Sequence, residues 1–396
     1  MRVIRLVHIT STAATQWAFL KGQNVFLARK GFEIHAVASP SPTLDELARR
    51  DGVEIHPVKI APAKLSIGDL VSLINLVRVF LRIKPHIVHV STPKAAFLGA
   101  LAARLVGVPI RIFFIRGLHT EGQRGARRSF YRLAEQTTAK LCNAWICVSP
   151  SLLRFARSEG ILSASQGLVP GHGMSNGVDA SHFEPKITRE SNSLTCLLNS
   201  LAIPAGAPVV GYVGRLVRDK GISELAAAWR LIRQRKPDAH LLLVGGWRCG
   251  PDAVPFQVRG ILETDPRVRC VGHVPDPAPY YALMSVLAFP SHGTEGFPNV
   301  PMEAAAMEVP SVVTNVVGCI DAVIDGVTGT VVSKGNVPEL TRALLMYLDD
   351  ENIRRAHGAA ARDRVVQNYK PELVWNALYQ EYLRLLQKRG LRTGKY

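Results

Sequence analysis

Short apolar runs alternate along the chain with longer segments in which apolar residues recur every three or four positions. The runs are rich in Val, Ile and Leu, as expected for strands that are buried on both faces of a parallel sheet. The longer segments, such as 69–83 and 94–106, have the spacing of amphipathic helices. The pattern therefore predicts an α/β fold with doubly wound parallel sheets. The predicted strands are 3–9, 32–39, 53–58, 86–90, 110–115 and 144–149, then 208–214, 239–246, 268–274, 286–291 and 310–316.

The two sets of strands are separated by a stretch rich in Ser, Asn, Pro and Gly. We therefore predict an N-terminal domain over 1–180, a linker over 181–204 and a C-terminal domain over 205–370. Past Val332 the chain has helical patterns to its end, and Pro371 opens a last helix, about 371–390, that we expect to return to the N-terminal domain. Two such domains would bind ligands in a cleft between the carboxyl ends of their strands.

Composition narrows the function classes. The 396 residues are 47% hydrophobic and 20% charged, which excludes a wholly disordered chain. A net charge of +17 indicates an anionic partner, which could be nucleic acid, a phosphorylated substrate or a membrane surface. Six cysteines without a CxxC pair favour a reducing compartment. Arg2 and Arg5 interrupt the apolar N-terminus, and no apolar run reaches 18 residues, so we expect neither a signal peptide nor a spanning helix.

The loop VGRLVRDKG joins the first strand of the second domain to a helix. Gly214 at the strand end would let an anion approach the backbone, while Arg215 and Lys220 would supply positive charge. Such a loop suits a diphosphate, although a basic solvated turn has the same composition.

Two glutamates stand in the segment SHGTEGFPNVPMEAAAMEVPSVVTN. Glu295 lies in the loop after a strand, and Glu303 is expected in the first turn of a helix that begins near Pro301. Two such carboxylates can accept hydrogen bonds from the vicinal hydroxyls of a sugar nucleotide. Backbone N–H groups of Phe297, Asn299 and Val300 could meet its phosphates. Each glutamate also has a simpler explanation when it is considered alone. Glu303 could do no more than stabilise the helix dipole, and Glu295 could be an exposed charge in a loop.

Together these motifs resemble the donor site of retaining family 4 glycosyltransferases, which have the GT-B fold of two Rossmann-like domains. The resemblance is carried by EGFPNVPME, in which seven residues separate two glutamates, and by GRLVRDKG. NGVD at Asn176 and VGHV at Val271 resemble two further motifs of the family, in the family's order. The nearest likeness is to the bacterial subgroup that builds capsule, O-antigen and exopolysaccharide.

The resemblance implies a role for each matched residue. Arg215 and Lys220 would hold the donor diphosphate, Glu295 would bind sugar hydroxyls near the reacting carbon, and Glu303 would bind the ribose. No DxD carboxylate pair stands in a suitable loop, so we expect no metal and no cofactor besides the nucleotide sugar. Glu295, Arg215 and Lys220 form the expected catalytic set. The expected donor-binding set is Gly214, Arg215, Lys220, Val274, Glu295, Gly296, Phe297, Asn299, Val300 and Glu303.

The sequence departs from the family pattern in three places. The first strand-to-helix loop, HITSTAATQ, lacks the usual glycines, and Pro298 removes an N–H group. After the fifth strand, Arg116 and His119 stand where many relatives have a single histidine, and either could take its polar role. Lys94 is a weaker candidate for a cation on the acceptor side.

The segment QRGARRSFYRLAEQTTAKL interleaves apolar residues with arginines. It could be a solvated helix face or an amphipathic helix at an anionic bilayer. The resemblance favours the bilayer, because acceptors in this subgroup are commonly polyprenyl-diphosphate-linked saccharides. We therefore expect a cytoplasmic protein that lies peripherally on the inner face of the cell membrane.

The expected reaction moves a hexose or N-acetylhexosamine, with retention, from a nucleotide diphosphate sugar, UDP rather than GDP, to a lipid-linked saccharide. A nucleotide-sugar epimerase or a phosphorylase would keep the fold and change the chemistry. A non-catalytic nucleic-acid-binding protein would also explain the positive charge, but the basic segments lack a stacking platform of aromatic residues, and we expect no nucleic acid.

Overall fold

A computed structural model describes residues 3–61, 67–189, 192–293 and 295–391, and the chain divides into two compact units. Unit 1 contains the chain up to Gly177 and again from Pro371, and unit 2 is Val178–Lys370. Residues 181–204, which we predicted to be a linker, belong to unit 2 and contain two helices. They are held there because Arg269 donates a hydrogen bond to the carbonyl of Ala202, 3.1 Å away.

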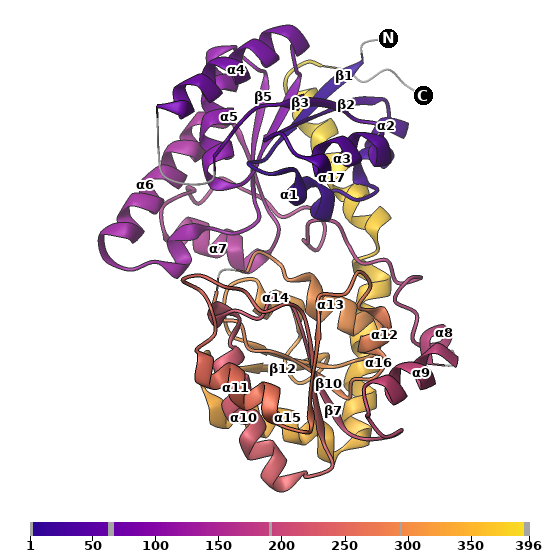
Figure 1. Cartoon of the computed structure of the whole chain (residues 1–396). Coiled ribbons are helices and arrows are strands. Elements are labelled where there is room, and N and C mark those ends of the chain that lie inside the picture. Colours follow the sequence, from indigo (N-terminus) through magenta and orange to yellow (C-terminus); the bar gives the residue numbers. More distant parts are fainter. Residues whose placement is uncertain (1–2, 62–66, 190–191, 294, 392–396) are drawn as a thin grey trace. The chain divides into compact units, whose positions relative to one another are not determined.

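The sheet of unit 1 has six parallel strands in the order β3-β2-β1-β4-β5-β6 (Figure 1). Its order reverses between β1 and β4, so the loops after these two strands flank a topological switch point. The strands are β1 Ile4–Ile9, β2 Phe32–Ala38, β3 Glu54–Pro57, β4 Ile87–Val90, β5 Ile110–Ile115 and β6 Ala144–Cys147.

The terminal helix α17 completes the core of unit 1 (Figure 1, yellow). The hydroxyl of Tyr382 lies 2.8 Å from Nδ1 of His89 on β4, and Nε1 of Trp375 donates to Asn176 at 2.7 Å. Gly22, with a φ of 78°, lies so near the ring of Trp375 that a Cβ there would come within 2.6 Å. The helices of unit 1 are α1 Ala13–Phe19, α2 Gln23–Arg29, α3 Pro42–Asp51, α4 Gly68–Ile83, α5 Pro93–Leu105, η1 His119–Gly122, α6 Gly125–Leu141, α7 Pro150–Ser158 and α17 Pro371–Lys388.

The sheet of unit 2 repeats the same topology, with the order β12-β11-β10-β7-β8-β9 and parallel pairing throughout. The predicted fold of two Rossmann-like sheets is therefore confirmed, with one strand, β12, that the sequence pattern did not predict. The switch point of this sheet lies between β7 and β10. The strands are β7 Val209–Val213, β8 His240–Val244, β9 Val268–Gly272, β10 Val286–Phe289, β11 Ser311–Thr314 and β12 Gly329–Val332.

Helices follow the strands of unit 2, as a doubly wound fold requires. Trp229 and Tyr347, from α10 and α15, are buried in one apolar cluster with Tyr212 of β7. The helices are α8 Pro185–Arg189, α9 Asn192–Ser200, η2 Arg218–Lys220, α10 Ile222–Arg235, α11 Phe256–Thr264, α12 Ala278–Tyr281, α13 Asn299–Ala306, α14 Cys319–Ala322, α15 Val337–Asp349 and α16 Glu351–Asn368.

Candidate functional site

The loop after β7 is fixed to the strand that precedes it. The hydroxyl of Tyr212 donates a 2.9 Å hydrogen bond to the carbonyl of Arg215, which leaves the guanidinium of this exposed residue at the protein surface. Burial, aided by the nearby carboxylates of Glu295 and Asp219, raises the pKa of Tyr212, so its hydroxyl stays a neutral donor. Gly214 begins the loop with a φ of 142°, a conformation that glycine adopts readily.

The loop after β7 is bonded to the loop after β10. The carbonyl of Asp219 accepts hydrogen bonds from the N–H groups of His292, at 2.7 Å, and Gly293, at 3.0 Å. Gly221, with a φ of 74°, sits so close to the carbonyl of Pro290 that no Cβ could fit between them. Backbone hydrogen bonds and this close contact therefore join the two loops that flank the switch point.

An ion pair between Lys220 and Glu295 joins these loops at their tips. Ser291 supports the pair by donating a 2.8 Å hydrogen bond to Oε1 of Glu295. The side chains of Lys220 and Glu295 are 15% and 13% exposed, so water screens their interaction less than it would on an open surface. Two of the three predicted catalytic residues thus meet at the switch point, and Arg215 stands in the same loop as Lys220.

A third loop contacts Glu295 from the end of β11. Gly318 has a φ of 83°, and a Cβ on it would come within 3.0 Å of the carbonyl groups of Glu295 and Gly296. The sequence carries no signal that would single out this glycine, Ser291 or Asp219. Their roles depend on contacts between loops that lie far apart in the chain.

Glu303 lies in the second turn of α13, where Tyr281 donates a 2.9 Å hydrogen bond to its Oε2. We predicted a helix starting near Pro301 with Glu303 in its first turn, and this was wrong. The helix begins at Asn299, because Pro301 fits within a first turn, where no N–H group is needed. Burial is the main reason that the pKa of Glu303 is raised, and it outweighs the hydrogen bond from Tyr281.

The remaining predicted donor residues lie around the same edge of the sheet. Asn299 and Val300 are the first two residues of α13, whose N–H groups have no acceptor within the helix. Phe297 is buried, with its ring 5.5 Å from that of Tyr369. Val274 lies two residues beyond Gly272, at the carboxyl end of β9.

Arg116 lies beside the switch point of unit 1. It follows β5, and its Nη1 donates a 2.8 Å hydrogen bond to Ser91 at the end of β4. Burial lowers the pKa of Arg116 to about 10, which leaves it charged at neutral pH. Beside it, Thr92 accepts a 3.0 Å hydrogen bond from the N–H of Ser11 and has a φ of 65°, a strained value for a β-branched residue.

The other two acceptor-side candidates of unit 1 are engaged elsewhere. Nζ of Lys94 lies 3.0 Å from Asp69, so that it joins α5 to α4. The N–H of His119 donates to Glu135 at 2.7 Å, and the ring of His119 packs 5.4 Å from that of Tyr131. Partial burial of the ring lowers the pKa of His119.

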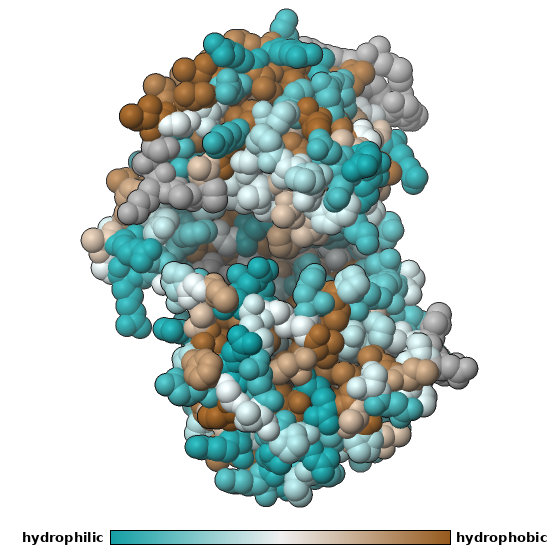
Figure 2. All heavy atoms as spheres, viewed as in Figure 1, coloured by the Kyte–Doolittle hydropathy of each residue, from teal (hydrophilic) through white to brown (hydrophobic). Residues whose placement is uncertain are grey.

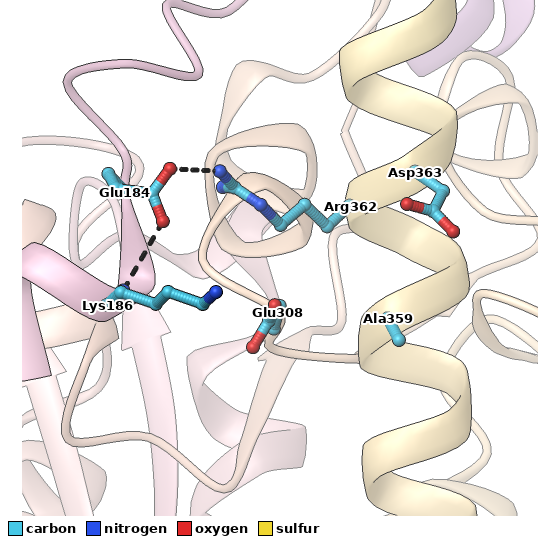
Figure 3. A pocket seen from close by; sticks show the side chains of 6 residues that line it. All are labelled: Glu184, Lys186, Glu308, Ala359, Arg362 and Asp363. Atoms are coloured by element: carbon cyan, nitrogen blue, oxygen red, sulfur yellow. Dashed lines mark hydrogen bonds and ion pairs between the residues drawn. The ribbon is translucent and has the colours of Figure 1, made fainter.

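A separate hollow on unit 2 lies away from these loops (Figure 3). Glu308 precedes β11, which places the hollow near the amino ends of the strands. Arg362 points into the hollow and donates hydrogen bonds to Glu184 and to the carbonyl of Phe183. Its guanidinium therefore already has an anionic partner, and these bonds join α16 to the first residues of unit 2. The hollow is lined by Glu184, Lys186, Glu308, Ala359, Arg362 and Asp363.

Two family models match the chain. The model described as "Glycosyl transferase 4-like domain" matches residues 26–170, and "Glycosyl transferases group 1" matches residues 207–350. The capsular polysaccharide biosynthesis glycosyltransferase CapM of Staphylococcus aureus is 31% identical over 96% of this chain and 97% of its own length. A galactosyltransferase of Escherichia coli, named for UDP-Gal and GlcNAc-diphosphoundecaprenol, is 25% identical over 87% of both chains.

Solved structures share the fold. A glycosyltransferase from Rickettsia africae superposes with a TM-score of 0.81 at 16% identity, covering 98% of this chain and all of that one. The Anabaena protein HepE, solved with UDP-glucose, gives 0.77 at 18% identity, covering 96% of this chain and all of that one. The two Rossmann-like sheets are the GT-B fold that these solved glycosyltransferase structures share. The chain belongs to the family 4 glycosyltransferases.

Proposed function

We propose that the protein transfers a hexose or N-acetylhexosamine, with retention, from a nucleotide diphosphate sugar to a polyprenyl-diphosphate-linked saccharide. UDP is favoured over GDP as the nucleotide. The observation that carries the proposal is the ion pair of Lys220 and Glu295 at the switch point of unit 2. Parallel α/β sheets bind ligands at such a point, and the pair offers both a cation for phosphate and a carboxylate for sugar hydroxyls.

The charges of unit 2 suit each part of a nucleotide sugar. Arg215 and Lys220 neutralise the diphosphate, aided by the N–H groups at the start of α13. Glu295 accepts hydrogen bonds from the sugar hydroxyls, and Glu303 accepts them from the ribose. Backbone around Gly272 and Val274 lines the base.

The reaction needs one bond to form and one to break at the anomeric carbon. The acceptor hydroxyl attacks on the face of the leaving group, the bond between carbon and phosphate oxygen breaks, and the departing phosphate takes the hydroxyl proton. Arg215 and Lys220 stabilise the charge that develops on the leaving diphosphate. The chemistry needs no metal ion, because these side chains supply the positive charge.

The acceptor is assigned to unit 1. Arg116, held by Ser91 at the second switch point, supplies a cation for the diphosphate of a lipid-linked saccharide. The lipid part of such an acceptor lies in a bilayer, so the enzyme must work at the membrane surface.

Two helices of unit 1 suit an anionic bilayer. Helix α4 exposes apolar side chains that form the brown area over it in Figure 2, and α6 exposes two more among its arginines. Both helices pack on α5. None of the described helices is both long and apolar enough to cross a membrane, which fits peripheral binding at the inner face. The exposed apolar residues are Ile67, Leu70, Val71, Ile74 and Leu81 at α4, and Phe130 and Leu133 on α6.

A donor screen tests the proposal. The purified full chain is incubated with UDP- or GDP-sugars labelled in the sugar, with and without native lipid extract. Label that enters the lipid fraction only when extract is present supports the transfer. An isomerised nucleotide sugar would instead identify an epimerase, and a sugar phosphate formed with inorganic phosphate would identify a phosphorylase.

A further inference from the structure

Two histidines and two glutamates gather on one face of unit 1, at the edge of its sheet. Glu33 and His35 belong to β2, and Glu54 and His56 belong to β3. The two strands pair in parallel, with His35 opposite Glu54 and Val37 opposite His56. Side chains two residues apart on a strand point to the same side, so all four groups share one face of the sheet.

The distances among three of these side chains suit a metal ion. Nδ1 of His35 lies 3.1 Å from Nε2 of His56 and 3.5 Å from Oε2 of Glu54. Nε2 of His56 lies 3.6 Å from Oε1 of Glu54. Bonds of about 2.0–2.2 Å to a tetrahedral zinc ion place its ligand atoms roughly 3.3–3.6 Å apart. The three side chains therefore need only small movements to share one ion.

The fourth side chain is placed to support the metal ligand. Nε2 of His35 lies 3.0 Å from Oε1 of Glu33. A metal-bound histidine almost always donates its other ring N–H to a carboxylate or carbonyl, which fixes its orientation and makes it a better ligand. His35 is buried, whereas Glu54 is exposed, so a fourth coordination position can face solvent.

Two cations lie near the cluster and moderate the expected affinity. Besides burial, the positive charge of Arg5 on β1 lowers the pKa of His35, and that of Arg82 on α4 lowers the pKa of His56. The guanidinium of Arg5 is turned toward the carbonyl of Lys84, to which it donates at 3.1 and 3.2 Å. It therefore does not occupy the position of an ion between the two histidines.

We propose that His35, His56 and Glu54 bind a zinc ion, with Glu33 as the supporting carboxylate of His35. Two imidazoles and one carboxylate favour zinc over magnesium or calcium, which prefer oxygen ligands. The bound ion cross-links β3, a four-residue strand at the edge of the sheet, to its neighbour β2. The site is separate from the donor site of unit 2 and does not depend on the proposed transfer reaction.

Metal binding by the full chain, after chelator treatment, tests the site directly. Calorimetry with Zn²⁺ should show one equivalent bound, and Co²⁺ in its place should give the intense visible spectrum of a tetrahedral complex. His56→Gln and Glu54→Gln should abolish stoichiometric binding, because each removes one of three ligands. Glu33→Gln should weaken it by about 10- to 100-fold, the usual effect of losing the supporting carboxylate.

A matched control separates the site from other histidines and cysteines. His172→Gln changes an exposed histidine outside the cluster and should bind Zn²⁺ like the wild type. Zn²⁺ should also raise the melting temperature of the wild type and leave that of His56→Gln unchanged. The absence of binding by the wild type would overturn the proposal, and so would undiminished binding by His56→Gln, which would indicate exposed cysteines such as Cys196 as ligands.

Discussion

Lys220 and Glu295 form an ion pair across two loops that are 75 residues apart in the sequence. The pair stands where the strand order of unit 2 reverses, and Ser291 and the backbone of Asp219 hold it in place. In the proposed reaction these two charges would need little reorganisation, because they are already positioned before substrate binds. This relationship leads to the first prediction.

Glu295→Gln keeps the shape of the side chain and removes its charge. We expect turnover to fall by about 10²- to 10³-fold, the usual cost of losing one electrostatic contact at a reacting centre, with little change in UDP affinity. Initial rates and calorimetry measure the two effects. Glu263→Gln, which removes an exposed carboxylate paired with Arg259, is the control and should react at the wild-type rate. Equal rates for the two variants would exclude a role for Glu295 beside the sugar.

Gly221→Ala should destabilise unit 2 and weaken UDP binding. Its φ of 74° costs an L-residue about 1–2 kcal/mol, and the new Cβ would collide with the carbonyl of Pro290. Gly260→Ala is the matched control, because nothing lies within 4 Å of a Cβ there and the position is helical. It should raise the unfolding free energy by roughly 0.5–1 kcal/mol. Denaturant unfolding measures the change in unfolding free energy, which should be negative for Gly221→Ala and positive for Gly260→Ala. A stabilised Gly221→Ala would contradict the close contact between Gly221 and the carbonyl of Pro290.

Glu303 should recognise the ribose hydroxyls of the donor nucleotide. Replacing UDP by 2′,3′-dideoxy-UDP should weaken binding to the wild type by about 1.5–3 kcal/mol, the range for hydrogen bonds to a charged group. Glu303→Ala should bind UDP and the dideoxy analogue with similar affinity, because the carboxylate that accepts the hydrogen bonds of the ribose hydroxyls is gone. Calorimetric titrations of both ligands measure the difference, with Glu263→Ala as the control. A variant that still discriminates between the two would show that other groups bind the ribose.

The partly buried carboxyl of Glu303 should also make stability depend on pH. Its pKa is raised in the folded state, so the folded protein binds a proton more tightly than the unfolded chain does. Its contribution to stability is therefore fully present below the unfolded pKa of about 4.5 and is lost as pH rises through the folded pKa. The unfolding free energy of the wild type, measured relative to Glu303→Gln, should decrease as pH rises from about 4.5 toward 7. An increase over that range would contradict the assigned direction.

Membrane binding should depend on the apolar side chains of α4. The double variant Leu70→Ser and Ile74→Ser removes two exposed aliphatic groups, each worth about 1.5–3 kcal/mol when buried. We expect its affinity for vesicles containing phosphatidylglycerol to fall at least about tenfold in a co-sedimentation assay. Leu231→Ser, on the exposed surface of α10 in unit 2, should bind like the wild type. Equal binding of the two variants would exclude α4 from the membrane surface.

The fold could be read from the sequence because buried parallel strands are almost uniformly apolar. Strand β12, Gly329–Val332, escaped prediction because it has four residues, one of them a glycine, and follows closely on a turn. Helix α13 begins at Asn299, two residues before Pro301, because proline fits other positions of the first turn as well as the first one, and this shift places Glu303 in the second turn.

For the candidate site, the sequence pattern predicts only which loops carry the residues, because it identifies where each strand ends. Lys220 and Glu295 each stand in a strand-to-helix loop, a position that the pattern identifies. Tyr281, which bonds to Glu303, and Gly318, which lies against Glu295, carry no such signal, because their roles arise from packing between loops. The pairing of His35 with His56 likewise depends on the register of two strands.

The return of α17 to unit 1 has a consequence during protein synthesis. The ribosome delivers residues 1–177 first, then the whole of unit 2, and only after unit 2 the helix whose Trp375 and Tyr382 pack against the first unit. The apolar surface that α17 covers therefore stays exposed on the earlier part of unit 1 until unit 2 has been synthesised. A truncation before Pro371 would leave that surface permanently open, and the expected outcome is aggregation of the N-terminal half.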